Sequence, residues 1–477
     1  MPTTISKLPF TLYYHLDCHM PQFDLFGKPT PIPGELEYHS RLIPIIDLRD
    51  ADQSEFEKKI RSWRIASPPD PTLLKKVLET IDAVQEFGDR GFLEMIAKQE
   101  RGDIASVDSV DDLILFPEQL QRMPEYSDKK FIKAIRIAIQ NISMFHIKQH
   151  QESWFIEDEE TGVRLGQRVT PMDSIAVLWT GLHPIELIMN TIPAKLAGVE
   201  RIVIAIESEE RTLSSLALAV IHELNPDEVI LSGGAPVVAA LAVGTETIPR
   251  VDKIVGVGDV EAQLAKQLLS GQVGIDSFSS CREMVIVGDQ GIDPHILAAD
   301  MLAQCEYSDL SGLILFLTSD STVSSTIEQL QSQLNQMGNA ASLMETLRRR
   351  TLIVLVNEAG QAAPWINEIA PQYVHLMIEE ADRSAKMIRN AGTILIGEYS
   401  SEAIGTFVAG PNLNVPAMGR ARFQSPLGID DFLHHANIIH LTRRKIEDLS
   451  RTAETILAKE GFPAHIQSLR HRLQKSE

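Results

Sequence analysis

The stretch LSGGAPVVAALAVGTETIPRVDKIVGVGD, residues 231–259, decides the fold class. A short apolar run ends at Gly233-Gly234, and a second short run, residues 253–255, ends at Gly256-Val257-Gly258. The compact apolar segment 235–243 between them suits a buried helix. A glycine turn between a strand and a helix lets a ligand approach the backbone at a helix N-terminus. The third glycine of a full dinucleotide fingerprint is missing, so this pattern alone leaves the ligand open.

Strand and helix alternate on both sides of this stretch. Short apolar runs predict strands at 175–179, 201–206, 227–231, 253–255, 284–287, 313–317, 352–356, 375–378 and 393–396. Helical spacing fills the gaps, for example at 186–198, 211–224, 294–305 and 321–346. Alternation of this kind produces parallel sheets covered by helices on both faces. We therefore predict an α/β fold with two doubly wound, Rossmann-like domains.

The domain boundaries follow from this alternation. We predict an extension at 1–41, a discontinuous α/β domain with a helical start from 42–155 plus 280–425, a second α/β domain at 156–279, and a helical tail at 426–477. Residues 445–459 have the spacing of an amphipathic helix, and Gly461 with Pro463 ends it. Such a tail is long enough to leave its own domain and pack on a neighbouring chain.

Composition excludes several classes of protein. A chain of 477 residues can bury more than one core, and its net charge of −21 argues against nucleic acid or an anionic membrane as a partner. The apolar runs are all too short to cross a bilayer, and the three cysteines form no C-x-x-C pair. We expect a reducing, cytoplasmic setting. The cluster HLDCH, residues 15–19, is more simply a polar turn than a metal site, because a proline-rich arm rarely fixes ligand geometry.

Several motifs outside the central stretch carry a more specific signal. They are PAKLAGVERIVIA (193–205), GID with the RE that follows (274–283), IAPQYVHLMIEEA (369–381), AGTILIGEYSSEAIG (391–405), SPLGIDDF (425–432) and KEGFPAH (459–465). Their wording, order and spacing resemble the histidinol dehydrogenase family from about residue 42 to about residue 473. The resemblance implies a homodimer, a bound zinc ion and the two-step, NAD-dependent oxidation of L-histidinol to L-histidine.

The resemblance also implies a zinc site made of Gln, His, Asp and His. Gln304 and His465 match two of these ligands, whereas Tyr307 and Thr406 occupy the positions of the other two. A tyrosine ligates a metal as the phenolate, which requires deprotonation from a pKa of about 10. Zinc at this site is therefore not expected. Without it, Gln304 would be a hydrogen-bonding residue at a helix end and His465 a polar residue in a subunit contact.

The acid and base of the family, an adjacent Glu and His, correspond to Gln372 and Tyr373 here. Glutamine exchanges no proton near neutral pH, and tyrosine is almost entirely protonated there. His375 lies two residues further on, and histidine is a common acid or base in catalysis, but a histidine in a strand more often packs or forms a structural hydrogen bond. The catalytic residues are therefore left open.

Some of the residues that the resemblance implies for substrate binding are retained, and others have changed. Arg282 stands where the family has a serine, beside a retained Glu283. A guanidinium there favours a carboxylate or phosphate, although an ordinary ion pair with Glu283 is the simpler alternative. Glu460, in KEGFPAH, matches a family substrate residue, and its carboxylate suits an ammonium or imidazolium group. Gln304 and His465 complete the candidate substrate-binding set.

The loops implied to bind NAD have changed too. Gly256 and Gly258 keep the turn, but Asp259 occupies an asparagine position and Pro236 a glutamine position. A carboxylate repels a pyrophosphate, although it can bind a ribose diol. The chain is therefore predicted to be a divergent relative of the dehydrogenase whose activity is altered or lost. Two alternatives stay open: a non-catalytic ligand-binding or regulatory protein, and an NAD-linked dehydrogenase of another amino alcohol.

Overall fold

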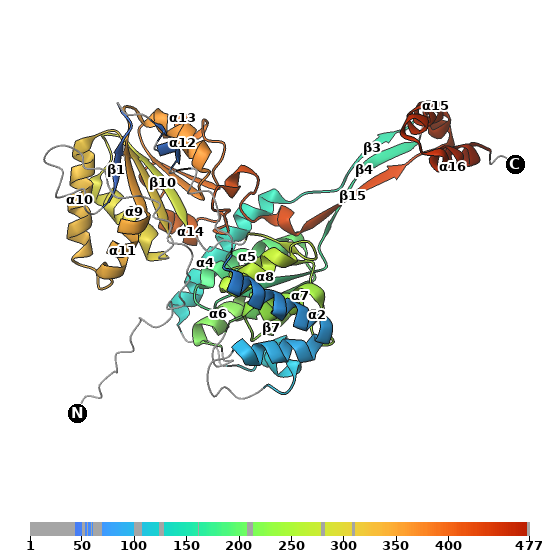
Figure 1. Cartoon of the computed structure of the whole chain (residues 1–477), viewed down its shortest axis with the longest axis horizontal. Coiled ribbons are helices and arrows are strands. Elements are labelled where there is room, and N and C mark those ends of the chain that lie inside the picture. The colour runs from blue at the N-terminus through green and yellow to red at the C-terminus, as the bar shows by residue number, and fades with distance from the viewer. Residues whose placement is uncertain are drawn as a thin grey trace.

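The computed structural model describes residues 43–49, 53–54, 56–58, 60, 69–99, 107–123, 128–160, 162–207, 213–277, 282–307 and 311–474. They form two α/β domains, and a long arm extends from one of them (Figure 1). The predicted extension at 1–41, including the HLDCH cluster, lies outside the described residues.

One domain is built on a sheet with the strand order β2-β7-β6-β5-β8-β9. Its strands are β2 (Ile114–Leu115), β5 (Ser174–Trp179), β6 (Arg201–Ile206), β7 (Glu228–Ile230), β8 (Lys253–Gly256) and β9 (Gly274–Ile275). All pairs are parallel except β2 with β7. Along β5, Ile175 and Val177 pack in one apolar cluster and Ala176 and Leu178 in another, because successive side chains point to opposite faces.

Helices cover both faces of this sheet. The cluster of Ile175 includes residues of α4 (Lys129–His146), α5 (Pro184–Ala197) and α6 (Ser215–Leu224). The cluster of Ala176 includes residues of α2 (Pro71–Gln99), α7 (Gly234–Val243) and α8 (Val260–Leu269). A sheet buried on both faces explains why its strands are continuous apolar runs in the sequence.

The other domain has a fully parallel sheet with the order β1-β12-β11-β10-β13-β14. Its strands are β1 (Ile45–Asp47), β10 (Glu283–Gly288), β11 (Gly312–Leu317), β12 (Thr351–Leu355), β13 (Tyr373–Met377) and β14 (Thr393–Ile396). One face carries α9 (Pro294–Tyr307), α10 (Asp320–Leu334) and α11 (Ala340–Arg350), and the other carries α12 (Ala362–Ile369) and α13 (Ala381–Ala385).

The two sheets have the same arrangement. In each, five consecutive strands follow the order 3-2-1-4-5, and a strand from earlier in the chain is added beside the third. The order reverses direction between β5 and β8 in one sheet and between β10 and β13 in the other. Ligands of doubly wound sheets bind beyond the carboxyl ends of the strands at such a point. The predicted pair of doubly wound, Rossmann-like domains is confirmed.

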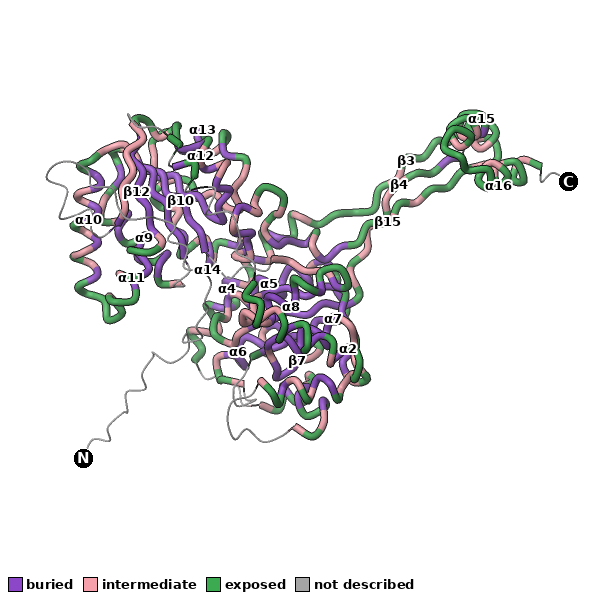
Figure 2. Tube along the Cα trace, viewed as in Figure 1, coloured by how far each residue is buried: buried purple, intermediate pink, exposed green. Residues whose placement is uncertain are grey.

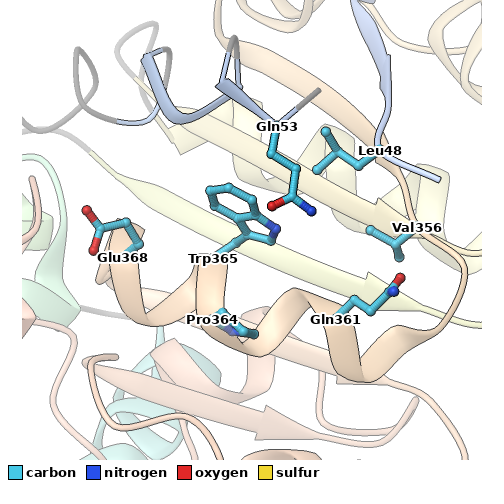
Figure 3. Close-up of a pocket in the computed structure, with 7 residues that line it drawn as sticks. All are labelled: Leu48, Gln53, Val356, Gln361, Pro364, Trp365 and Glu368. Carbon is cyan, nitrogen blue, oxygen red and sulfur yellow. The ribbon is translucent and has the colours of Figure 1, made fainter. Parts of the chain in front are cut away.

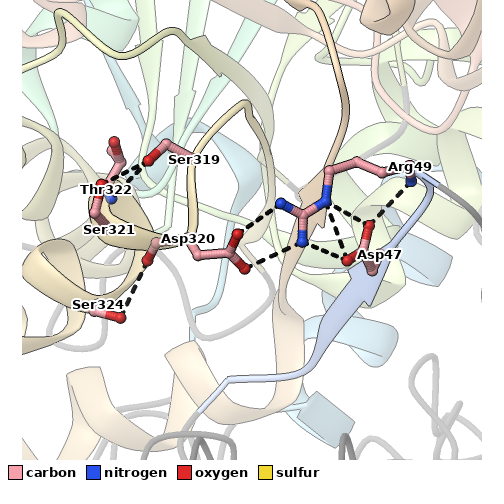
Figure 4. Close-up of polar contacts among 7 residues, drawn as sticks. All are labelled: Asp47, Arg49, Ser319, Asp320, Ser321, Thr322 and Ser324. Atoms are coloured by element: carbon pink, nitrogen blue, oxygen red, sulfur yellow. Dashed lines mark hydrogen bonds and ion pairs between the residues drawn. The ribbon is translucent and has the colours of Figure 1, made fainter.

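The added strand β1 is fixed by a network of charges (Figure 4). Arg49 contacts Asp47 at the end of β1 and Asp320 at the start of α10, with 2.6 Å between Arg49 Nη1 and Asp320 Oδ2. Ser319 caps α10 by accepting a hydrogen bond from the backbone of Thr322. An edge strand of three residues has few ladder hydrogen bonds, so these contacts hold it in register.

The helical start differs from the prediction for residues 42–155. β1 joins the sheet of residues 283–396 as expected, but β2 pairs with β7, and α2 packs on α7 and α8. The start of the chain is therefore divided between the two domains. Helical spacing shows that α2 has an apolar face, but it does not identify the sheet that this face covers.

The segment 321–346 also differs from the single predicted helix. It forms α10 and α11, and a turn separates them around Gly338. Glycine destabilises a helix interior, so the chain breaks there despite continuous apolar spacing. Short helices complete the fold at α3 (Pro117–Leu120) and α14 (Glu402–Phe407), with 3-10 turns at Val110–Leu113, Ile147–Gln149, Ala359–Gln361, Arg420–Arg422 and Ile429–Phe432.

The arm consists of a three-stranded antiparallel sheet with two helices at its far end (Figures 1 and 2). Its elements are β3 (Trp154–Asp158), β4 (Val163–Pro171), β15 (Leu433–His440), α15 (Arg443–Glu460) and α16 (Pro463–Gln474). The tail was predicted to be helical from 426, so β15 is a correction. None of the described helices is both long and apolar enough to cross a membrane.

Candidate functional site

A polar cluster of four buried and two half-buried residues lies where the two domains meet. It contains Arg282 just before β10, Tyr373 at the start of β13, Tyr307 at the end of α9, Glu402 and Thr406 on α14, and Glu186 in the first turn of α5. We call it the Arg282 cluster. Four of the predicted site positions therefore come together. Asn414 adds a link between the domains, because its Nδ2 donates to Asn190 Oδ1 at 2.8 Å.

Arg282 is the centre of this cluster and is only 4% exposed. Its Nη1 donates to Glu402, and its Cζ lies 3.5 Å from the centre of the Tyr307 ring and 5.4 Å from that of Tyr373. Burial alone would lower the pKa of Arg282, but the surrounding tyrosines and carboxylates raise it above its ordinary value. The cluster therefore holds a permanent cation, between a carboxylate and two aromatic rings.

Tyr307 connects the two domains. Its hydroxyl donates to Glu186 on α5, and its ring stacks on His183 with 5.7 Å between centres. Burial and the Glu186 carboxylate raise the pKa of Tyr307 well above its ordinary value. The phenol therefore remains protonated and acts as a hydrogen-bond donor at neutral pH.

Thr406 and Tyr373 complete the inner side of the cluster. Thr406 Oγ1 donates to Glu402 Oε1 at 2.9 Å, one helical turn away on α14. Tyr373 is buried, and burial raises the pKa of its hydroxyl although the Arg282 guanidinium acts in the opposite direction. Neither side chain can serve as a base near pH 7.

Gln304 lies one turn before Tyr307 on α9 and is fully buried. Neither atom of its amide has a hydrogen-bond partner among the described residues. An unpaired buried amide costs about 1–3 kcal/mol. Such a group commonly contacts a ligand or an ordered water.

Gln372, at the position of the predicted base, has a structural role. Its Oε1 accepts from the backbone N–H of Glu283 at 3.0 Å, and its Nε2 donates to the carbonyl of Val415 at 2.8 Å. Glu283 in turn accepts from the backbone of Met418 at 2.8 Å. Both ends of the amide are used, so Gln372 joins β10 to the loop before the arm.

His375 lies inside the domain on β13 and is fully buried. Its Nε2 is 3.0 Å from the carbonyl oxygen of Gly397, and its Nδ1 is 3.4 Å from Asp300 on α9. These contacts fit a packed histidine that joins a strand, a helix and a loop.

The donor set around Tyr307 does not fit a zinc ion. Zinc ligands in proteins are mostly thiolates, imidazoles and carboxylates. Here Tyr307 and Thr406 are protonated hydroxyls that donate to carboxylates, and the Arg282 guanidinium would repel a second cation. Among the described residues, no three His, Cys, Asp or Glu side chains gather as a metal-binding group.

The predicted cofactor residues lie on the other sheet, at its switch point. Gly256 ends β8 with a φ of 88°, and a Cβ there would lie 2.3 Å from the carbonyl oxygen of Leu178. Asp259 caps α8, with Oδ1 2.7 Å from the backbone nitrogen of Ala262, and burial raises its pKa. Its carboxylate therefore occupies the helix N-terminus that a pyrophosphate would use.

A buried ion pair between Lys266 and Asp276 holds the turn at Gly256 in place. Lys266 donates to Asp276 at 2.5 Å and to the carbonyl of Gly256 at 2.7 Å. The other oxygen of Asp276 accepts from the backbone of Gly256 and from Asn414. The turn is therefore rigidly positioned, because each of its anchors is paired and hydrogen-bonded.

Glu460 and His465 lie at the far end of the arm (Figure 1). His465 is exposed, and its ring packs on Phe462 with 5.2 Å between centres. The fold holds both residues away from the Arg282 cluster of the same chain.

A hollow of about 440 Å³ lies elsewhere, between α12 and the residues that follow β1 and β12 (Figure 3). Trp365 forms one wall, and its ring packs edge-on against Phe56. The amide of Gln361 is used locally, because it accepts from the backbone of Asn357 and Glu358. None of the predicted site residues lines this hollow.

Two residues of the cluster escaped the sequence predictions. Glu402 lies four residues before Thr406, a spacing that puts both on one face of a helix, so its position was open to prediction. Glu186 lies on the other domain, about 120 residues from Tyr307, and local sequence carries no signal for that contact.

The sequence matches one protein family along most of its length. The family model described as histidinol dehydrogenase matches residues 67–473. The histidinol dehydrogenase of Methylococcus capsulatus is 34% identical over 428 residues, 89% of this chain and 97% of the relative. That of Acinetobacter baylyi is 34% identical over 85% of this chain and 94% of the relative.

A solved structure shares the fold. The histidinol dehydrogenase of Elizabethkingia anophelis superimposes with a TM-score of 0.80 at 24% identity, covering 90% of this chain and 98% of that one. The family model and the curated relatives each span most of the described residues, including the Arg282 cluster and the arm. The chain belongs to the histidinol dehydrogenase family.

Proposed function

We propose that this chain binds a small-molecule ligand at the Arg282 cluster but does not complete the NAD-dependent oxidation of L-histidinol to L-histidine. The observation that carries this proposal is the use of Gln372. Its amide is hydrogen-bonded at both ends to the backbone, and an amide exchanges no proton near neutral pH. Tyr373 beside it is buried and protonated. The second oxidation needs a base to activate water, and the cluster offers none at this position.

We further propose that NAD is not bound with ordinary affinity. The Asp259 carboxylate caps α8 at the point where a pyrophosphate would approach, and the two charges repel. The switch point between β5 and β8 is nevertheless retained, with its glycine turn and its paired Lys266. That feature favours the second candidate, an NAD-linked dehydrogenase of another amino alcohol.

A homodimer in the cytoplasm is the third part of the proposal. The arm exposes apolar side chains that water normally disfavours: Trp154, Ile156 and Ile439 are 52%, 65% and 71% exposed. Leu165 lies opposite both Ile156 and Ile439 in the ladder, so these residues form one row. A three-stranded sheet with two exposed faces buries little apolar surface of its own. A second chain would cover the exposed apolar row of the arm.

The body carries a matching surface near the cluster. Ile137, Met144 and Phe145 on α4 are exposed, and so are Ile404 and Phe407 on α14. We call this the α4–α14 patch. Asn141 joins the two helices by donating to the carbonyl of Val408 at 2.9 Å. Docking of a second arm on this patch would bring the partner's His465 toward α14, which carries Glu402 and Thr406.

The test combines binding and turnover on one sample of the full chain. We expect no NADH formation from L-histidinol and NAD, and no calorimetric signal for NAD. The matched variant Asp259→Asn removes the repelling charge and keeps the cap, so it should gain NAD binding if the crevice is otherwise intact. Turnover of L-histidinol to L-histidine by the unmodified protein would refute the proposal. NADH formation from another amino alcohol would favour the second candidate.

A further inference from the structure

Arg282 is a buried cation between a carboxylate and an aromatic ring. It is buried to 96%, contacts the Glu402 carboxylate and lies 3.5 Å above the Tyr307 ring. A buried charge is tolerated only when it is paired and hydrogen-bonded. The sequence places this guanidinium directly before β10, a strand buried along its whole length, so the backbone that carries it is fixed.

The side chains around Arg282 are arranged to serve it. Glu402 accepts from Arg282 and from Thr406, so its charge is already neutralised. Tyr307 presents its ring to the guanidinium and directs its hydroxyl away, toward Glu186. A metal ion that used the Glu402 carboxylate would have to displace the guanidinium from it.

We propose that Arg282 is a cation supplied by the protein that replaces a metal ion in this cluster and excludes one. Two cations in one buried site repel each other strongly, because the surroundings screen them poorly. Arg282 Nη2 has no hydrogen-bond partner among the described residues. Ligand recognition is then metal-independent, and the group that binds here is a hydrogen-bond acceptor such as a carboxylate or carbonyl oxygen. This inference rests on the proposed loss of oxidation, but its test measures metal content and not turnover.

The experiment asks whether zinc binding requires the removal of Arg282. The first variant of the full chain carries Tyr307→His and Thr406→Asp, and the second adds Arg282→Ser. Both variants offer three side chains to zinc: Gln304, the new imidazole and the new carboxylate. Catalytic zinc sites normally have three protein ligands. After dialysis against zinc, we expect less than about 0.1 zinc per chain in the first and about 1 in the second, by elemental analysis.

Two further variants serve as controls. Arg282→Ser alone should bind no zinc, since Tyr307 and Thr406 remain neutral hydroxyls. A second triple variant with Arg282→Met in place of Arg282→Ser keeps more of the side-chain volume, in case serine leaves a cavity that prevents folding. Stoichiometric zinc in the variant that keeps Arg282 would overturn the inference. Folded triple variants without zinc, judged by circular dichroism, would overturn it equally, because Arg282 would then not be the excluding group.

Discussion

The Arg282 cluster and the arm depart from the usual distribution of residues in opposite directions. In the cluster, charged side chains are buried, whereas in the arm large apolar side chains are exposed. The buried charges have partners within the chain, because Arg282 pairs with Glu402 and Tyr307 with Glu186. The apolar row Ile156, Leu165 and Ile439 has no such cover. The charges of the cluster are thus paired within one chain, whereas the apolar row of the arm needs another surface.

Removal of residues 441–477 should have the largest effect. It deletes α15 and α16 with Ile456 and Phe462, which are among the exposed apolar residues at the end of the arm. We expect monomers or insoluble protein in analytical ultracentrifugation, where the full chain forms dimers. A soluble dimer after this deletion would show that the helices of the arm are not the main dimer contact. The exposed apolar surface of the arm would then not require a second chain.

A finer test of the arm changes only its apolar row. Ile439→Asp places a charge where Leu165 and its neighbours would be covered by a second chain. Burying an unpaired carboxylate is costly, so the dimer should dissociate at concentrations where the unmodified chain stays associated. His435→Asp, on the same face of β15, lies at an exposed polar position and serves as the matched control. Equal dissociation of both variants would indicate a general charge effect.

Removal of one partner inside the cluster should affect stability more than association. Glu402→Ala leaves the Arg282 guanidinium buried and unpaired, which costs about 3–5 kcal/mol of the free energy of unfolding. Glu402→Gln keeps the acceptor oxygen and should lose roughly half as much. Urea denaturation followed by circular dichroism measures both variants. Equal stability of Glu402→Ala and the unmodified chain would mean that Arg282 reaches water or another carboxylate.

Tyr307→Phe should have a smaller effect, because it removes only the hydroxyl that donates to Glu186. A hydrogen bond to a charged group contributes about 1.5–3 kcal/mol. The ring remains under the guanidinium, so the loss should be confined to the contact between the domains. Proteolysis of the folded protein should become faster at the domain junction, and a double change with Glu186→Gln should add little. Additive losses would show that the two residues are not coupled.

The sequence was sufficient for nine of the twelve strands in the two six-stranded sheets, but not for the short strands β1, β2 and β9 or for the arm. Strands such as β5 and β11 are apolar throughout because helices cover both of their faces. β3, β4 and β15 are short of buried residues within one chain, so their pattern resembles that of a surface loop or a polar helix. The candidate site was likewise predicted only in part. Positions on one motif, such as Gln304 and Tyr307, were located from the sequence, whereas the contact of Tyr307 with Glu186 depends on how two domains pack.

Asp259→Asn should have the smallest effect on stability, and its sign depends on pH. Burial raises the pKa of Asp259 in the folded protein above its value in the unfolded chain. The native state therefore holds this proton more tightly, and the residue's contribution falls as the pH rises from the unfolded pKa through the folded one. Asparagine caps a helix about as well as aspartate, so the variant should be more stable at pH 7 by about 1 kcal/mol or less.

The Asp259→Asn variant should lose this advantage in acid, where Asp259 is neutral in both the folded and the unfolded state. Urea denaturation at pH 7 and at about pH 2.5 measures the difference, with Asp128→Asn, at the exposed cap of α4, as the control. A stabilisation that is the same at both pH values would contradict this prediction. It would mean that water solvates the Asp259 carboxylate and that the N-terminus of α8 is accessible to a ligand.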